Sequence, residues 1–133
     1  YCIARPELIA DMNRVKFSYS PYNVNSMTQA AGTAAIQDEA YFRDITAKLL
    51  ATRADTTEKL RQRGFTVFDS ATNFLFATTD RIPCKEIFEK LRAQGILIRH
   101  FNAPRISNYL RITIGTDAEM QRFFTALDEI LAH

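Results

Sequence analysis

Cysteine and histidine are scarce in this sequence, which has two of each among 133 residues. Cys2 and Cys84 lie far apart and no C-x-x-C motif is present, so no disulfide framework is indicated. His100 and His133 complete no zinc-ligand spacing, so no metal site is predicted. The two thiols are expected to be reduced, as in a cytoplasmic protein.

Long hydrophobic runs and blocks of like charge are also missing. No apolar stretch approaches the roughly 20 residues that cross a bilayer, and no signal-peptide pattern opens the sequence. The formal net charge is only +2, and the basic residues are scattered along the chain. Neither a membrane nor a nucleic acid is therefore an expected partner.

What the sequence does contain is an ordinary globular mixture, with 47% hydrophobic and 24% charged residues. A chain of this length forms a core without disulfides or metals. It begins at Tyr1 on YCIA, a short run typical of the end of a strand, and not at a methionine. We therefore expect a piece of a longer protein, some of whose functional residues lie outside this sequence.

The first half of the chain has the hydrophobic periodicity of helices. Pro6 and Glu7 suit the first turn of a helix that continues to about Lys16. A break over residues 18–26 follows, and residues 25–63 are helical again. Because such a helix is long for a globular domain, a bend is expected at residues 37–38. Gly64 is the natural C-terminal stop.

The second half alternates between strand and helix patterns. A helix is predicted from Cys84 to Gly95, and a last helix is capped by Asp117, with Glu119 on its solvated face. Strands are predicted over residues 65–70, 72–79, 96–101 and 110–116. This order indicates an α+β fold with helices packed on a small, mostly antiparallel sheet.

Two arginines stand inside apolar strand patterns, Arg99 in ILIRHF and Arg111 in LRITIGT. If these strands form a hairpin around the 102–109 loop, a near-symmetric register places Arg99 opposite Arg111. Like charges directly across a sheet are destabilising. An anion between them relieves the repulsion, because a guanidinium binds carboxylate or phosphate through paired hydrogen bonds. The alternative is that each arginine is solvated or ion-paired on the polar face of the sheet.

Several stretches together resemble a known family over essentially the whole chain. YCIARPELIADMNRVK, SPYNVNSMTQAA, ATNFLF, GILIR and LRITIGT occur in the order and approximate spacing of histidinol-phosphate aminotransferases. These belong to the fold type I enzymes that use pyridoxal phosphate. The resemblance implies that residues 1–36 end the large domain and begin the interdomain helical segment. Residues 37–133 would then form the small C-terminal domain.

The resemblance also implies an activity for the full-length parent. That parent would be a cytoplasmic homodimer that moves an amino group between glutamate and imidazole-acetol phosphate, in the biosynthesis of histidine. Its partners would be small molecules, a phosphorylated amino alcohol and glutamate. The Ser-Lys motif that binds the cofactor would lie before Tyr1, and none of the five lysines here sits in such a motif. No bound pyridoxal phosphate, catalytic residue or activity is expected for this chain alone.

Substrate recognition is what the resemblance assigns to this chain. Arg111 matches the family's anion-binding arginine, and Arg99 matches a second arginine near the same anion. Tyr22 and Asn23 lie where a loop approaches the neighbouring subunit's site, although turn-forming and helix-capping roles are the alternative. Asn73 is a further candidate, with the alternative that it satisfies the turn before a strand.

Other functions remain open at this point. On the same scaffold, an aromatic amino acid aminotransferase or a related decarboxylase would share the carboxylate-binding arginine. A free-standing α+β module would bind a small anion without chemistry. A purely structural domain would show no dependence on anions.

Overall fold

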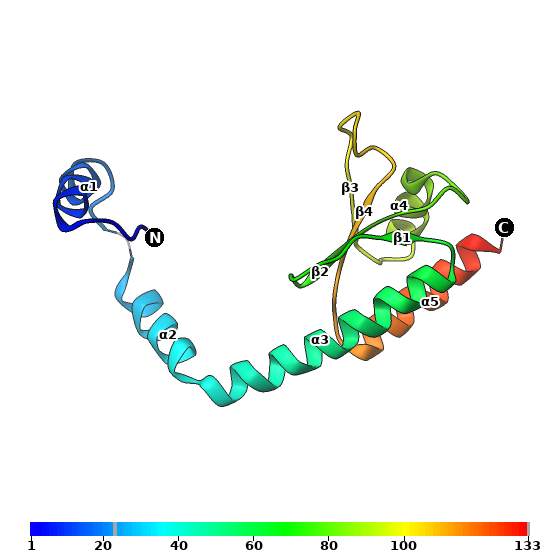
Figure 1. Ribbon diagram of the computed structural model, residues 1–133, viewed down its shortest axis with the longest axis horizontal. Helices are drawn as coiled ribbons and strands as arrows, with labels where there is room; N and C mark the ends of the chain where they lie inside the picture. Colours follow the sequence, from blue (N-terminus) through cyan, green and yellow to red (C-terminus); the bar gives the residue numbers. More distant parts are fainter. Residues whose placement is uncertain (23, 133) are drawn as a thin grey trace. The chain divides into compact units, whose positions relative to one another are not determined.

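The computed structural model describes residues 1–22 and 24–132. Within this part, five helices and four strands follow one another along the chain (Figure 1). They belong to two compact units, Tyr1–Phe42 and Arg43–His133. The predicted division between 1–36 and 37–133 rests on the resemblance and stays a prediction.

The first unit contains α1 (Pro6–Tyr19), α2 (Ser26–Gln37) and the first residues of α3 (Glu39–Gln62). Proline occupies the first turn of α1, as predicted. The Asn25 side chain caps α2 by accepting a hydrogen bond from the Thr28 backbone N–H at 2.8 Å. Asp38 separates α2 from α3, so the bend expected at residues 37–38 is confirmed.

One prediction for this unit is wrong. Residues 1–4 were expected to end a strand, yet they are exposed and pair with no strand in the described part of the chain. A β-strand requires a hydrogen-bonded neighbour. A strand-like composition alone therefore does not produce one.

The second unit is built around one four-stranded antiparallel sheet. Its spatial order is β1-β2-β4-β3, with every neighbouring pair antiparallel. The strands are β1 (Thr66–Val67), β2 (Phe74–Thr78), β3 (Arg99–His100) and β4 (Leu110–Thr113). The order places β4 inside the sheet and β3 at its edge, so β3 has a partner on one side only.

The two faces of this sheet differ in composition, because side chains alternate along a strand. Leu75, Ala77, Leu110 and Ile112 are buried in a single core cluster. The cluster also takes buried side chains from α3, from α4 (Cys84–Ala93) and from α5 (Asp117–Leu131), so the helices cover this face. The other face carries the residues between these positions, which include both Arg99 and Arg111. The predicted α+β architecture is confirmed.

The helix ends follow the sequence signals with one exception. Gly64 and Gly95 adopt positive φ angles of 82° and 75° after α3 and α4, a conformation that glycine reaches without steric cost. The cap of α5, however, is Thr116 and not Asp117. The Thr116 hydroxyl accepts from the Glu119 N–H, and the Glu119 carboxylate accepts from the Thr116 N–H at 2.7 Å. Hydrogen bonds from the Thr116 N–H and hydroxyl to the carboxylate lower the pKa of Glu119, which caps the helix and is also exposed to solvent, as predicted.

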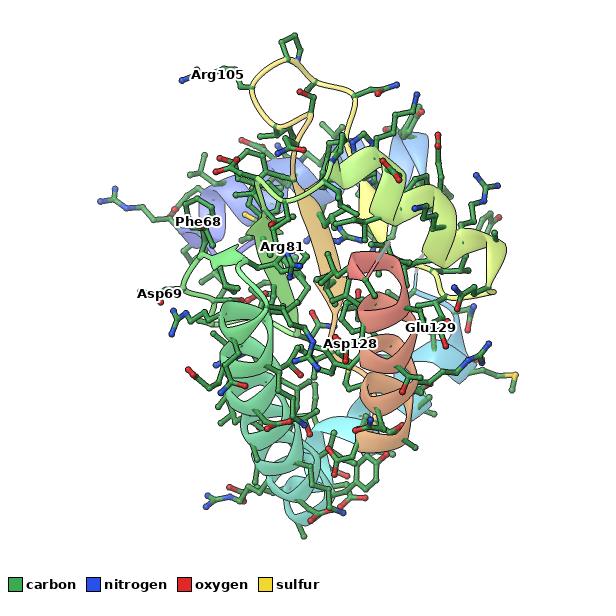
Figure 2. The ribbon with its side chains drawn as sticks, turned by 90° about the vertical axis from the view of Figure 1, so that its right-hand side faces the viewer. Phe68, Asp69, Arg81, Arg105, Asp128 and Glu129 are labelled. Carbon is green, nitrogen blue, oxygen red and sulfur yellow. The ribbon has the colours of Figure 1, made fainter. Side chains whose placement is uncertain are left out.

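An ion pair joins the end of α3 to α5. Arg63 donates two hydrogen bonds to the Asp128 carboxylate, at 2.6 and 2.8 Å. Asp128 lies on the side of α5 that faces α3, whereas Glu129 points away from it (Figure 2). Hydrogen bonding to Arg63 holds the pKa of Asp128 below its ordinary value.

The Asn108 side chain fastens the end of the 102–109 loop, directly before β4. Its amide oxygen accepts from the Cys84 backbone N–H at 2.9 Å, at the start of α4. Its amide nitrogen donates to the Thr79 carbonyl at 3.0 Å, just after β2. One side chain thus joins β2, α4 and the start of the strand that carries Arg111.

We expect the Arg63–Asp128 pair to make stability depend on acid. A carboxylate with a lowered folded-state pKa stabilises the protein above the ordinary aspartate range and loses that contribution as the pH falls. Asp128→Asn should lower the free energy of unfolding at pH 7 by about 0.5–1 kcal/mol, since the carboxylate is half-exposed. The deficit should shrink towards pH 3 in urea titrations. Glu129→Gln, on the same helix, is the control; an equal deficit for it would contradict the assignment.

The Asn108 bonds generate a second stability prediction. Asn108→Ala should reduce the free energy of unfolding by about 1–3 kcal/mol, because the Cys84 N–H and the Thr79 carbonyl lose their side-chain partner. Asn102→Ala is the matched control, because Asn102 is exposed in the same loop. Equal denaturation midpoints for the two variants would show that Asn108 does not fasten the loop.

Candidate functional site

The candidate site is the arginine pair on the open face of the sheet. Arg99 and Arg111 are direct partners in the antiparallel β3–β4 ladder, so the predicted register is confirmed. Directly opposed residues project from the same face of a sheet. Among the described residues, no ion pair or hydrogen bond with an acidic side chain involves either guanidinium. Ion pairing is therefore not what the structure shows for the described residues, and the alternative of a solvated side chain stays open for Arg99, which is exposed.

The two arginines differ in burial. Arg99 is exposed, whereas Arg111 is half-buried. The Nε atom of Arg111 is buried and has no hydrogen-bond partner within the described part of the chain. A buried donor without an acceptor is destabilising by about 1–3 kcal/mol. Arg111 therefore offers an unused N–H group as well as a positive charge.

Aromatic rings lie under both guanidinium groups. The guanidinium carbon of Arg111 is 5.2 Å from the centroid of the Phe74 ring. That of Arg99 is 5.4 Å from the centroid of the Phe101 ring. Cations within about 6 Å of a ring face are attracted to its negative quadrupole. Each guanidinium is thus attracted to an aromatic ring, whereas no carboxylate of the described residues attracts it.

A cluster of four aromatic residues borders the arginine pair, and we call it the aromatic cluster: Phe68, Phe76, Phe101 and Tyr109. Phe76 is the register partner of Arg111 on β2. Its ring stacks on Tyr109 at 4.8 Å and meets Phe101 edge-on at 5.9 Å. This cluster was not predicted from the sequence. The alternation of Arg99 and Phe101 within ILIRHF was the available signal, but the cross-strand partners became visible only with the register.

The remaining predicted site residues are not brought to the pair by any described contact. Tyr22 belongs to the first unit and is 92% exposed. Asn23 lies outside the described residues. Asn73 is exposed; its carbonyl accepts from the Ile114 N–H, and the side chains of Ser70 and Thr72 provide the hydrogen bonds of the preceding turn. The suggested roles of these three residues stay predictions.

Three other polar or reactive residues of the second unit do not join the arginine pair through any described contact. His100 lies on the opposite strand face from Arg99, accordingly stacks on Phe88 and hydrogen-bonds the Ser107 carbonyl at 2.7 Å. Cys84 is fully buried, and this burial raises the pKa of its thiol, so it is not an activated nucleophile. Arg105 projects outward from the tip of its loop (Figure 2).

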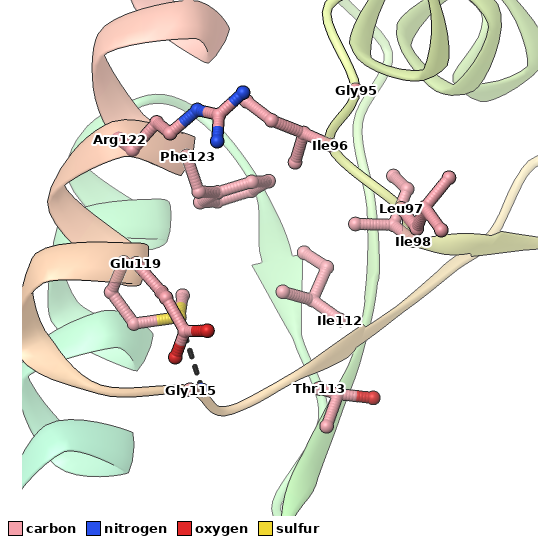
Figure 3. A pocket seen from close by; sticks show the side chains of 11 residues that line it. Gly95, Ile96, Leu97, Ile98, Ile112, Thr113, Gly115, Glu119, Arg122 and Phe123 are labelled. Carbon is pink, nitrogen blue, oxygen red and sulfur yellow. Dashed lines mark hydrogen bonds between the residues drawn. The ribbon is translucent and has the colours of Figure 1, made fainter.

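A separate cavity of about 300 Å³ lies where the chain segments around β3 and β4 diverge (Figure 3). Ile98, Ile112 and Phe123 line it, and the ladder beside it is limited to the two residues of β3. The strand predicted over 96–101 is therefore shorter than expected. The charged groups of this cavity are already used, because Arg122 donates to the Gln94 carbonyl and Glu119 caps α5. We do not assign a ligand to it.

The resemblance assigns pyridoxal phosphate to the full-length parent, and the arginine face contains no lysine that could attach it. Covalent binding of pyridoxal phosphate requires a lysine and a partner for the pyridine nitrogen. All five lysines lie on helices, and four of them are ion-paired within their own helix: Lys48, Lys59, Lys85 and Lys90. The described side chains of this face are arginine, aromatic and threonine residues. The guanidinium groups among them suit the recognition of an anion.

This chain is similar to known aminotransferases along almost its whole length. Residues 1–127 match the family described as aminotransferase class I and II. Histidinol-phosphate aminotransferase 2 of Rhizobium meliloti is 44% identical over 98% of this chain and 37% of its own length. The Clostridium botulinum histidinol-phosphate aminotransferase is 39% identical over the same shares. This chain thus spans a little over a third of the length of these relatives.

Solved structures agree with this result. The Sinorhizobium meliloti histidinol-phosphate aminotransferase, crystallised with pyridoxal-5'-phosphate, superimposes with a TM-score of 0.78 at 26% identity. The match covers 87% of this chain and 33% of that one. The Clostridium acetobutylicum enzyme gives a TM-score of 0.80 at 21% identity, which shows a shared fold. In the described part of this chain, no helix is sufficiently long and apolar to span a bilayer.

Proposed function

Because this chain belongs to the class I and II aminotransferase family, we propose that it forms the part of an aminotransferase that recognises the anionic end of the substrate. The reaction we propose is transfer of an amino group between glutamate and imidazole-acetol phosphate in histidine biosynthesis. Several relatives of 38–44% identity carry the name histidinol-phosphate aminotransferase, which supports this substrate pair.

The single observation that carries the proposal is the direct pairing of Arg99 with Arg111, for which the described residues provide no acidic partner. Two cationic side chains at directly paired positions on one face repel each other, and a sheet does not favour such a pair by itself. A bound anion converts the repulsion into attraction, and it offers the acceptor that the buried Nε of Arg111 lacks. The arrangement is thus more favourable with an anion than without one.

The same pair serves both halves of the proposed reaction. Glutamate presents a carboxylate and the other substrate presents a phosphate, and a guanidinium binds either through two parallel hydrogen bonds. Placement on strands gives the rigidity that a recognition site requires. Arg99 and Arg111 therefore bind and orient the substrate, and they do not take part in the bond changes.

Transfer of the amino group is chemistry that pyridoxal phosphate supplies when it is bound. The proposal assigns the attachment of that cofactor to residues outside this sequence. The homodimer, the cytoplasmic location and contacts from Tyr22, Asn23 and Asn73 belong to the same proposal. They rest on the resemblance.

Substitution of Arg111 tests the proposal in an active aminotransferase that carries this chain. Arg111→Ala should raise KM for both glutamate and the phosphorylated substrate, by an amount corresponding to about 2–5 kcal/mol of binding free energy, since a charged hydrogen-bonding partner is removed. Arg105→Ala is the matched control, because Arg105 is an exposed arginine of the neighbouring loop. Unchanged kinetics for both substrates in Arg111→Ala would refute the role in anion binding.

A second measurement tests the assignment of the cofactor. When this chain alone is mixed with pyridoxal phosphate and reduced with borohydride, we expect only the scattered labelling of exposed lysines. Mass spectrometry of the peptides distinguishes this outcome from a stoichiometric adduct. A single fully modified lysine would show that the chain contains the attachment site.

A further inference from the structure

The proposed function does not explain how the two cationic side chains of the arginine pair stay in place before the substrate binds. When no substrate is bound, two opposed cations remain on the sheet, and no acidic side chain in the described chain holds either of them. Repulsion would turn two long, flexible side chains away from each other. Each guanidinium instead lies near an aromatic ring, Phe74 for Arg111 and Phe101 for Arg99.

The two rings support their arginines in different ways. Arg111 is on β4, inside the sheet, and Phe74 approaches it from the neighbouring strand β2. Arg99 is on the edge strand β3, and Phe101 follows it by two residues in the same segment. The ring of Phe101 is itself held edge-on against Phe76 at 5.9 Å. Arg99 is exposed, and within the described part of the chain its guanidinium has no ion pair, so the Phe101 ring is the group that restrains it.

We propose that Phe74 and Phe101 are positioning residues that hold the two guanidiniums ready for the substrate, and that Phe101 acts selectively on the phosphorylated substrate. This inference rests on the proposed function. A ring under each cation restricts its side chain before binding, so less conformational entropy is lost when the anion arrives. Neither residue touches the substrate in this scheme.

The selectivity follows from the chemistry of the two anions. A carboxylate has two oxygens and one negative charge, which one guanidinium satisfies through a bidentate contact. A phosphate monoester has three terminal oxygens and about two charges, which match two guanidiniums. Arg111, the half-buried member with a free buried Nε, is the natural single partner of the carboxylate. Arg99 is then needed mainly when the anion is a phosphate.

Four variants of the active aminotransferase that carries this chain test the inference. Phe101→Leu removes the ring under Arg99 and should raise KM for the phosphorylated substrate about three- to fivefold, the range of an exposed cation–π contact. KM for glutamate should stay within about twofold, since its contact with Arg111 is intact. Phe74→Leu should raise both KM values by similar factors. Phe101→Tyr retains a ring and should behave as the parent does.

Phe68→Leu is the matched control. Phe68 belongs to the same aromatic cluster, with ring contacts to Phe76 at 6.0 Å and Tyr109 at 5.9 Å, but it lies under neither arginine. Its loss should disturb packing as much as the loss of Phe101 while leaving the ratio of the two KM values unchanged. Thermal denaturation of each variant identifies general destabilisation, which does not by itself alter that ratio.

The outcomes separate this inference from the proposed function. If Phe101→Leu raises both KM values equally, leaves both unchanged, or matches Phe68→Leu, the positioning role of Phe101 is wrong. If Phe101→Tyr fails to preserve the parent ratio, ring support is not the cause. These results leave the anion-binding role intact as long as Arg111→Ala raises both KM values. If Arg111→Ala has no effect, the proposed function itself fails.

Discussion

Two arginines are paired directly across the β3–β4 ladder, and both project from the open face of the sheet in the second unit. Such a pair is unfavourable unless a negative charge or the negative face of an aromatic ring lies beside it. The described chain offers no carboxylate there and supplies aromatic rings instead. The face is thus complementary to an anion from outside, and the remaining features of the sheet keep the two side chains in register.

The opposite face of the same strands has a different role. Alternation sends Leu110 and Ile112 into a core that α3, α4 and α5 complete, and that core fixes the backbone that carries Arg111. Asn108 holds the chain directly before β4. Thr116 and Glu119 hold it soon after β4, at the start of α5. A strand fastened at both ends and buried on one face is a rigid support for a binding side chain.

The family assignment and the geometry are both consistent with the proposal that this chain recognises the substrate while residues outside it carry the chemistry. The chain spans little more than a third of the length of its curated relatives, and its open sheet face carries two arginines beside aromatic rings. A guanidinium pair that accepts both carboxylate and phosphate suits a reaction in which substrates with these two groups use one site in turn. In our proposal, the aromatic ring beneath each guanidinium allows the same site to distinguish the carboxylate substrate from the phosphate substrate.

Local patterns in the sequence determined most of the secondary structure, since helix stops and hydrophobic periodicity act within a few residues. Gly64 and Gly95 were predicted in this way, whereas the register of Arg99 with Arg111 required the further assumption of a symmetric hairpin around the 102–109 loop. The strand expected at residues 1–4 and the length of β3 were not, because strands exist only where a partner pairs with them. The rings under the arginines, the aromatic cluster and the spatial order of the strands join residues distant in sequence. Only tertiary structure decides such contacts, because alternation assigns a side chain to a face but does not identify its neighbour on the next strand.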